Sequence, residues 1–182
     1  MMRSFVVVTL LSTAGCLFVP PPPGNALGME GKYVGEAEST TRRKYTSFTG
    51  GTSTTETTFT DEGDRITVFI SRGYESDAVL EIFSACAVPL RAAGMRLELV
   101  DEAHCTSQSD STYQFGNQTR TYRSENDLTI TKAVVEPDGA PGNVKITVET
   151  ESRSEGFTDE QKTSESTETM EWEFKGTRVS DE

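Results

Sequence analysis

The only histidine of the chain, His104, stands among residues with which it could do chemistry. Asp101 and Glu102 precede it and Cys105 follows it. A Cys–His nucleophile requires the two side chains to face each other, whereas adjacent residues of a strand point to opposite faces of a sheet. His104 and Cys105 therefore cannot form such a pair locally. We expect His104 to be a surface residue, no residue to be catalytic, and the protein not to be an enzyme.

Acidic residues around Gly63 are the best candidates for a metal site. Asp61, Glu62 and Asp64 flank this glycine, and Asp101 with Glu102 forms a second acidic pair. Neither group has the alternating oxygen ligands of an EF-hand loop. The chain also has no C-x-x-C motif and no glycine-rich phosphate loop. We therefore expect these carboxylates to be solvated, with no metal and no cofactor.

The chain has three cysteines, Cys16, Cys86 and Cys105, an odd number for an exported protein. If Cys16 is modified, Cys86 and Cys105 remain as a pair. A disulfide between them would persist in an oxidising compartment. The alternative is two unpaired buried thiols.

The first residues have the layout of an export signal. Arg3 is followed by an apolar run that begins at Phe5 and reaches at most Val19. This run is shorter than the ~20 residues that a membrane-spanning helix needs, and the prolines at 20–23 prevent its continuation. The pattern is typical of a secretory signal, and the prolines predict an extended linker.

The segment Ser12-Thr13-Ala14-Gly15-Cys16 resembles the lipobox of bacterial lipoproteins, although Thr13 replaces the usual Leu or Val. The resemblance implies a signal peptide at 1–15, a lipidated Cys16 that anchors the protein to a membrane, a linker to residue 28 and one domain at 29–182. The alternative is an ordinary signal cleaved after Gly28, which would give a secreted or periplasmic soluble protein.

Composition predicts an all-β domain with a thin core. Hydrophobic residues make up 34% of the 182 residues, and there are 26 Thr and 17 Ser. Thr is β-branched and favours strands. The net charge of -12 repels nucleic-acid phosphate, so we expect no nucleic-acid partner.

From Met29 onward, alternating patterns predict nine or ten antiparallel strands. Gly50-Gly51 marks a polar hairpin that should extend beyond the core. Residues 61–64 are predicted to form a turn, 149–168 a strand extension with an exposed loop, and Met170, Trp172 and Phe174 the inner face of a last strand that closes the sheet.

Sequential hairpins favour an up-and-down β-barrel, with a two-sheet sandwich as the alternative. Gly31-Lys32-Tyr33-Val34-Gly35 resembles the opening motif of lipocalin-like barrels, with Tyr in place of Trp. The first functional hypothesis is an exported, lipid-anchored envelope protein that binds a small apolar ligand. The residues expected to line its interior are Tyr33, Ile66, Val68, Leu80, Ile82, Met95, Leu97 and Trp172. The alternative hypothesis is a structural or interaction module of the cell surface that binds another envelope protein and no small ligand.

Overall fold

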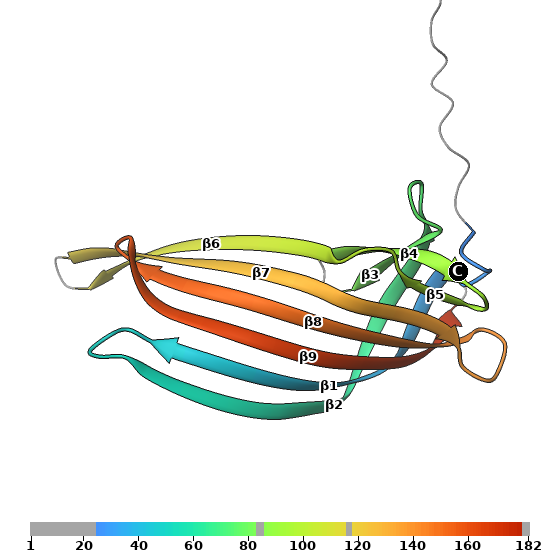
Figure 1. The fold of residues 1–182 in the computed structure, drawn as a ribbon, viewed down its shortest axis with the longest axis horizontal. Coiled ribbons are helices and arrows are strands. Elements are labelled where there is room, and N and C mark those ends of the chain that lie inside the picture. Colours follow the sequence, from blue (N-terminus) through green and yellow to red (C-terminus); the bar gives the residue numbers. More distant parts are fainter. Residues whose placement is uncertain (1–24, 83–85, 116–117, 180–182) are drawn as a thin grey trace, which may run out of the picture.

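The computed structural model describes residues 25–82, 86–115 and 118–179. The predicted signal peptide, Cys16 and all but the last residues of the linker lie outside these ranges. The described chain forms nine antiparallel strands (Figure 1). They are β1 (Gly31–Ser47), β2 (Ser53–Arg72), β3 (Ala78–Ile82), β4 (Cys86–Ala93), β5 (Arg96–Leu99), β6 (Ala103–Phe115), β7 (Gln118–Pro137), β8 (Asn143–Thr158) and β9 (Gln161–Val179). The all-β expectation is confirmed.

The strands form one up-and-down sheet in the order β5-β4-β3-β2-β1-β9-β8-β7-β6. The last strand pairs with the first, from Lys32↔Val179 to Ser47↔Ser164, so the prediction that the last strand closes the sheet is confirmed. A further pairing of β5 with β7, at Leu97↔Val135, completes a ring of hydrogen-bonded strands at one end of the molecule.

β5 and β6 lie one after the other along the same edge of β7. Leu97 is paired with Val135, and the segment from Ala103 to Phe115 continues this edge from Ile130 to Gln118. Because β3 and β4 are short, the other strands run on past them as an open sheet. Figure 1 shows these long strands reaching away from the end where β3, β4 and β5 lie.

We call the closed part the ring end. The open part, residues 42–61, 106–115, 118–127 and 151–169, is called the extension.

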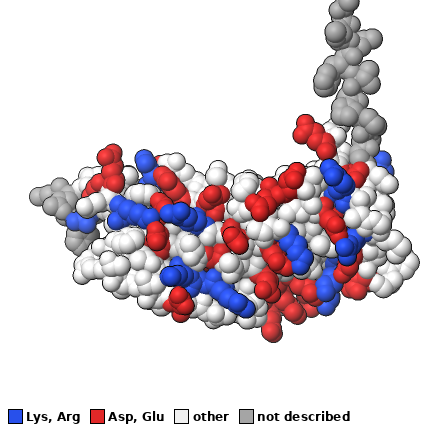
Figure 2. All heavy atoms as spheres, in the orientation of Figure 1, with Lys and Arg blue, Asp and Glu red and all other residues white. Residues whose placement is uncertain are grey.

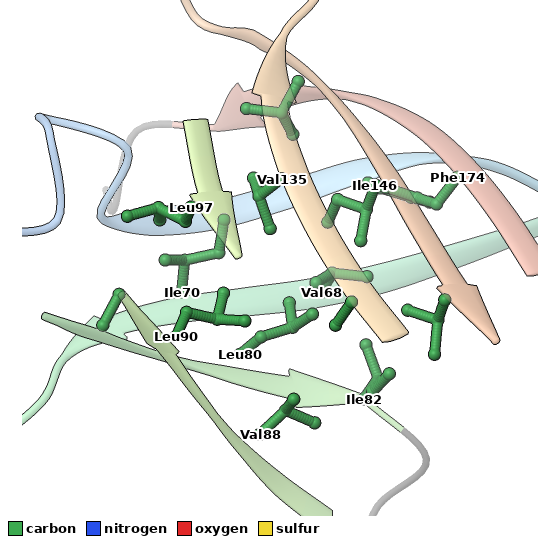
Figure 3. Packing of buried hydrophobic residues seen from close by; sticks show 14 of the residues in the cluster. Val68, Ile70, Leu80, Ile82, Val88, Leu90, Leu97, Val135, Ile146 and Phe174 are labelled. Carbon is green, nitrogen blue, oxygen red and sulfur yellow. The ribbon is translucent and has the colours of Figure 1, made fainter. Parts of the chain in front are cut away.

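The hydrophobic core lies inside the ring end. Alternate residues of each strand point inward, and those with apolar side chains are buried there, as Figure 3 shows for ten labelled residues. Val68, Leu80, Leu90, Ile146 and Phe174 are among the fully buried side chains. None of the buried hydrophobic residues belongs to the described part of the extension. The polar hairpin predicted to extend beyond the core does so.

Residues 61–64 are not a turn, contrary to the sequence prediction. They lie inside β2, where the register with β1 shifts so that Ala37 pairs with Asp64 and Glu38 with Glu62. Gly63 is the extra residue of this bulge and has φ of 84°, a conformation that glycine adopts without steric cost. A single glycine among charged residues thus marks a bulge here.

The exposed loop predicted within 149–168 is also wrong. These residues belong to β8 and β9, which are joined by the two-residue turn Asp159-Glu160. Both turn residues have positive φ, 51° and 66°, as a tight hairpin turn requires. The segment has no apolar alternation because its two faces are both polar. Strand pairing over a polar sheet leaves no hydrophobic signal in the sequence.

The segment that leads into β1 covers the end of the ring. Ala26 and Met29 are buried in the core cluster. The Tyr33 hydroxyl donates a hydrogen bond of 2.8 Å to the Met29 carbonyl. Arg178, near the end of β9, donates to the Gly28 carbonyl and to the Tyr33 hydroxyl. The two ends of the described chain therefore meet over the ring.

Candidate functional site: the open polar sheet

Seven of the eight residues expected to line an interior point toward the core, and one does not. Tyr33, Val68, Leu80 and Leu97 are fully buried, Ile82 and Trp172 are nearly so, and Ile66 packs against the cluster while partly exposed. Met95 is 79% exposed, which corrects its assignment. It follows Gly94 in the hairpin turn between β4 and β5, before the alternation of β5 begins at Arg96.

The extension separates its hydroxyl residues by face. We call the face that continues the lining of the ring end the inner face. Starting from Trp172 and Phe174 and following the pairings outward, every serine of the extension falls on it. These serines are Ser47, Ser53, Ser107, Ser109, Ser111, Ser124, Ser152, Ser154, Ser164 and Ser166. The outer face carries mostly Thr and charged residues.

A charged pair crosses the inner face. The Arg43 Nε donates to Glu168 Oε2 at 2.6 Å, joining β1 to β9. The Arg43 guanidinium also lies 5.4 Å from the ring centre of Phe59 on β2, a cation–π distance. Three neighbouring strands of the extension are thus connected through one arginine.

Aromatic side chains are exposed on the β1–β2 hairpin. Tyr45, Phe48 and Phe59 are 43%, 38% and 39% exposed. The Lys162 ammonium lies 5.8 Å from the Phe48 ring centre, and the Phe48 amide donates to the Thr163 carbonyl. Exposed aromatic residues with a polar surround are typical of protein interaction surfaces.

A second group of charged residues lies beside the turn that joins β8 to β9. Lys162 bonds Glu165 at 2.6 Å and Glu155 at 3.0 Å. These hydrogen bonds, that to Glu165 first, raise the pKa of Lys162. The hydrogen bond from Lys162 lowers the pKa of Glu155. Both partners stay ionised over a wide pH range, so this group fixes charge at the far end of the sheet.

The outer face has shallow hollows. One of about 420 Å³ is lined by Arg42, Lys44, Glu56 and Asp127, among others. Another, of about 400 Å³, lies over the ring end beside Glu36 and Lys175. Figure 2 shows that Lys and Arg side chains are interspersed with Asp and Glu along the visible face. On this face both signs of charge are present, with Asp and Glu gathered toward the ring end.

The residues singled out for chemistry lie apart. His104 is exposed, and its Nδ1 is 3.0 Å from the Thr129 hydroxyl. Asp61, Glu62 and Asp64 are exposed along β2. Within the described ranges, no three His, Cys, Asp or Glu side chains gather closely enough to hold a metal ion.

Cys86 and Cys105 form a disulfide pair, with Cα atoms 5.9 Å apart. The predicted pairing is therefore present, and it joins the start of β4 to β6. Cys86 follows the end of β3 in the chain, and Cys105 is opposite Leu128 of β7. The disulfide thus marks the level at which the ring ends and the extension begins.

Sequence reasoning missed the serine face and the Arg43–Glu168 pair. The sequence did contain a signal for the serine face, because serines recur at every second position in three segments. These serines are Ser107, Ser109 and Ser111, Ser152 and Ser154, and Ser164 and Ser166. The ion pair joins residues 125 positions apart, and no local pattern indicates it.

Fold and surface define an antiparallel all-β protein with a closed, apolar end and an open, hydroxyl-rich sheet. Comparison with protein-family models, curated proteins and solved structures finds no significant match. None of the described residues forms a helix with the length and apolar character needed to cross a bilayer.

Proposed function

We propose that this chain is an exported interaction module of the cell surface that binds another protein through its extension. The single observation that carries the proposal is that six strands run past the core with polar residues on both faces. A sheet with two polar faces buries little apolar area to offset the entropy of ordering its residues. Such a structure is expected where the exposed sheet itself has a role.

The ring end supplies the stable body in this proposal. Its core side chains form one buried cluster, which includes Ala26 and Met29 from the segment before β1. The ring of hydrogen-bonded strands supports the proposal that this end is an up-and-down barrel and not a two-sheet sandwich. Because its lining residues contact one another, we prefer the extension over the interior as the binding element.

Export and lipid anchoring at Cys16 are part of the same proposal. The Cys86–Cys105 pair supports an oxidising compartment. Mass spectrometry of the mature N-terminus tests the anchor. A diacylglycerol-modified Cys16 supports it, whereas an N-terminus after Gly28 supports the soluble alternative, and an intact Met1 overturns export.

Site-specific photocrosslinking in cells tests where binding occurs. We expect a crosslinker at Tyr45, on the extension, to give protein adducts. The matched control is Met95, which is also exposed but lies at the ring end, and it should give none. Adducts at Met95 alone, or at neither position, would overturn the proposal.

The competing hypothesis of a small apolar ligand is tested with an apolar fluorescent probe. Trp172 is the single tryptophan and contacts the core. Quenching of Trp172 by stoichiometric probe, at a concentration that leaves the protein folded, would favour the interior as the binding site and count against the extension.

A further inference from the structure

The outer edge of β2 is unpaired over most of its length. β3 pairs with β2 only from Phe69 to Arg72, and no other described strand pairs with that edge. Residues 53–65 are all exposed. Free N–H and C=O groups along a sheet edge are a template for a further strand.

Two halves of this edge differ in how they are protected. The half near the ring has the bulge at Gly63 and three carboxylates, Asp61, Glu62 and Asp64. Bulges and charges are the devices by which natural edge strands avoid pairing. The far half, residues 53–60, has no bulge and no proline, and Glu56 is its only charged residue. This half is rich in Thr, which favours strand pairing.

We propose that residues 53–61 of β2 pair antiparallel with the same residues of a second copy of this chain, about a two-fold axis at Thr57. The inference rests on the proposed function, since it names the partner of the extension. Thr57 is the midpoint between Ser53, where β2 begins, and Asp61, where the protected half begins. Isologous two-fold pairing is the commonest arrangement of protein dimers.

This register suits the side chains. On the inner face, Thr55 lies opposite Phe59 of the second copy, a β-branched–aromatic pair that stabilises sheets. On the other face, Glu56 lies opposite Thr58. An axis at Glu56 would instead place two carboxylates opposite each other, which is destabilising.

The shape of the protein also permits this pairing. Antiparallel alignment puts the two ring ends at opposite ends of the dimer, so β3 and β4 of one copy do not meet those of the other. The six strands of each extension then join in one continuous sheet. Each copy has a net charge of -12, so the copies repel at low ionic strength, and added salt should strengthen the dimer.

A cysteine at the two-fold axis tests the register. Thr57→Cys, in a Cys16→Ser background, should form a disulfide-linked dimer on mild oxidation, since directly opposed residues lie within disulfide reach. Thr54→Cys is the matched control. In the dimer its two copies would lie six residues apart along the strand, roughly 20 Å, so oxidation should give no disulfide-linked dimer. No crosslink at Thr57, or equal crosslinking at both positions, would overturn the proposal.

A charge on the axis provides a second test by sedimentation. Thr57→Lys should abolish the dimer, because two lysines would oppose each other, although the substitution lowers the overall repulsion. Thr112→Lys, on the exposed edge of β6, makes the same charge change and should leave the dimer intact. A protein that is monomeric at all salt concentrations refutes this inference. If Tyr45 still crosslinks to a different protein, the proposed function stands without it.

Discussion

Loss of the Cys86–Cys105 disulfide should lower the free energy of unfolding, and the size of the decrease depends on the length of the loop that the disulfide closes. The cysteines are 19 residues apart, and closing a loop of about 20 residues stabilises by about 3 kcal/mol in the chain-entropy model. With a urea m-value of about 1–3 kcal/mol/M, the midpoint of unfolding should fall by about 1–3 M. Trp172, only 6% exposed, reports unfolding by its fluorescence.

The assay compares urea unfolding with and without dithiothreitol. The Cys86→Ala/Cys105→Ala variant should resemble the reduced protein and should not respond to the reductant. If reduction leaves the wild-type curve unchanged, or if the double variant still responds, these two sulfurs are not linked in the folded protein. Either result refutes the argument that the ring end and β6 are held together at this point.

Three further predictions concern the core, a close backbone contact and acid stability. Phe174→Ala should cost about 3–5 kcal/mol, the value for truncating a fully buried aromatic side chain, whereas Phe69→Ala, 45% exposed, should change thermal stability far less. Gly35→Ala should destabilise severely, because its Cβ would collide with the Lys175 carbonyl oxygen; a melting temperature equal to that of wild type would contradict this. The pKa of Asp77 is lowered by hydrogen bonds from the backbone amides of Ala92 and Asn25, and that of Glu173 by hydrogen bonds from Lys145 and Lys175. The pKa of each carboxyl group is lower in the folded than in the unfolded protein. Each group therefore contributes fully to folding stability above the unfolded pKa of about 4, and this contribution is lost as the pH falls through the folded pKa. Urea midpoints from pH 7 to pH 2 should therefore decline less steeply for Asp77→Asn than for wild type, and parallel curves would exclude a role for Asp77.

Where the core is apolar, the sequence predicted the fold well. Alternating apolar residues gave the inner face of the last strand, since Met170, Trp172 and Phe174 must share a side when successive residues point to opposite faces. The Gly50-Gly51 turn was found by residue type, because positive φ favours glycine. The two strands that this turn joins, β1 and β2, are present and paired.

Prediction failed where strands are polar. Residues 149–168 lack an apolar face, so their pairing is visible only when the neighbouring strands are in place. Met95 shares alternation with Leu97, but a turn residue does not obey the period of the strand that follows. The candidate site could not be predicted for the same reason. Its serines come from six strands, and they share one face only when the register of those strands is known.

Amino-acid order alone predicted that this protein is all-β, that its strands follow one another as hairpins, and that Cys86 and Cys105 form a disulfide if Cys16 is modified. Only the tertiary structure decided that the sheet closes at one end and stays open at the other. The reason is length: β3 and β4 are shorter than the strands around them, and the resulting free edge of β2 depends on pairings between residues far apart in the chain, which local patterns do not encode.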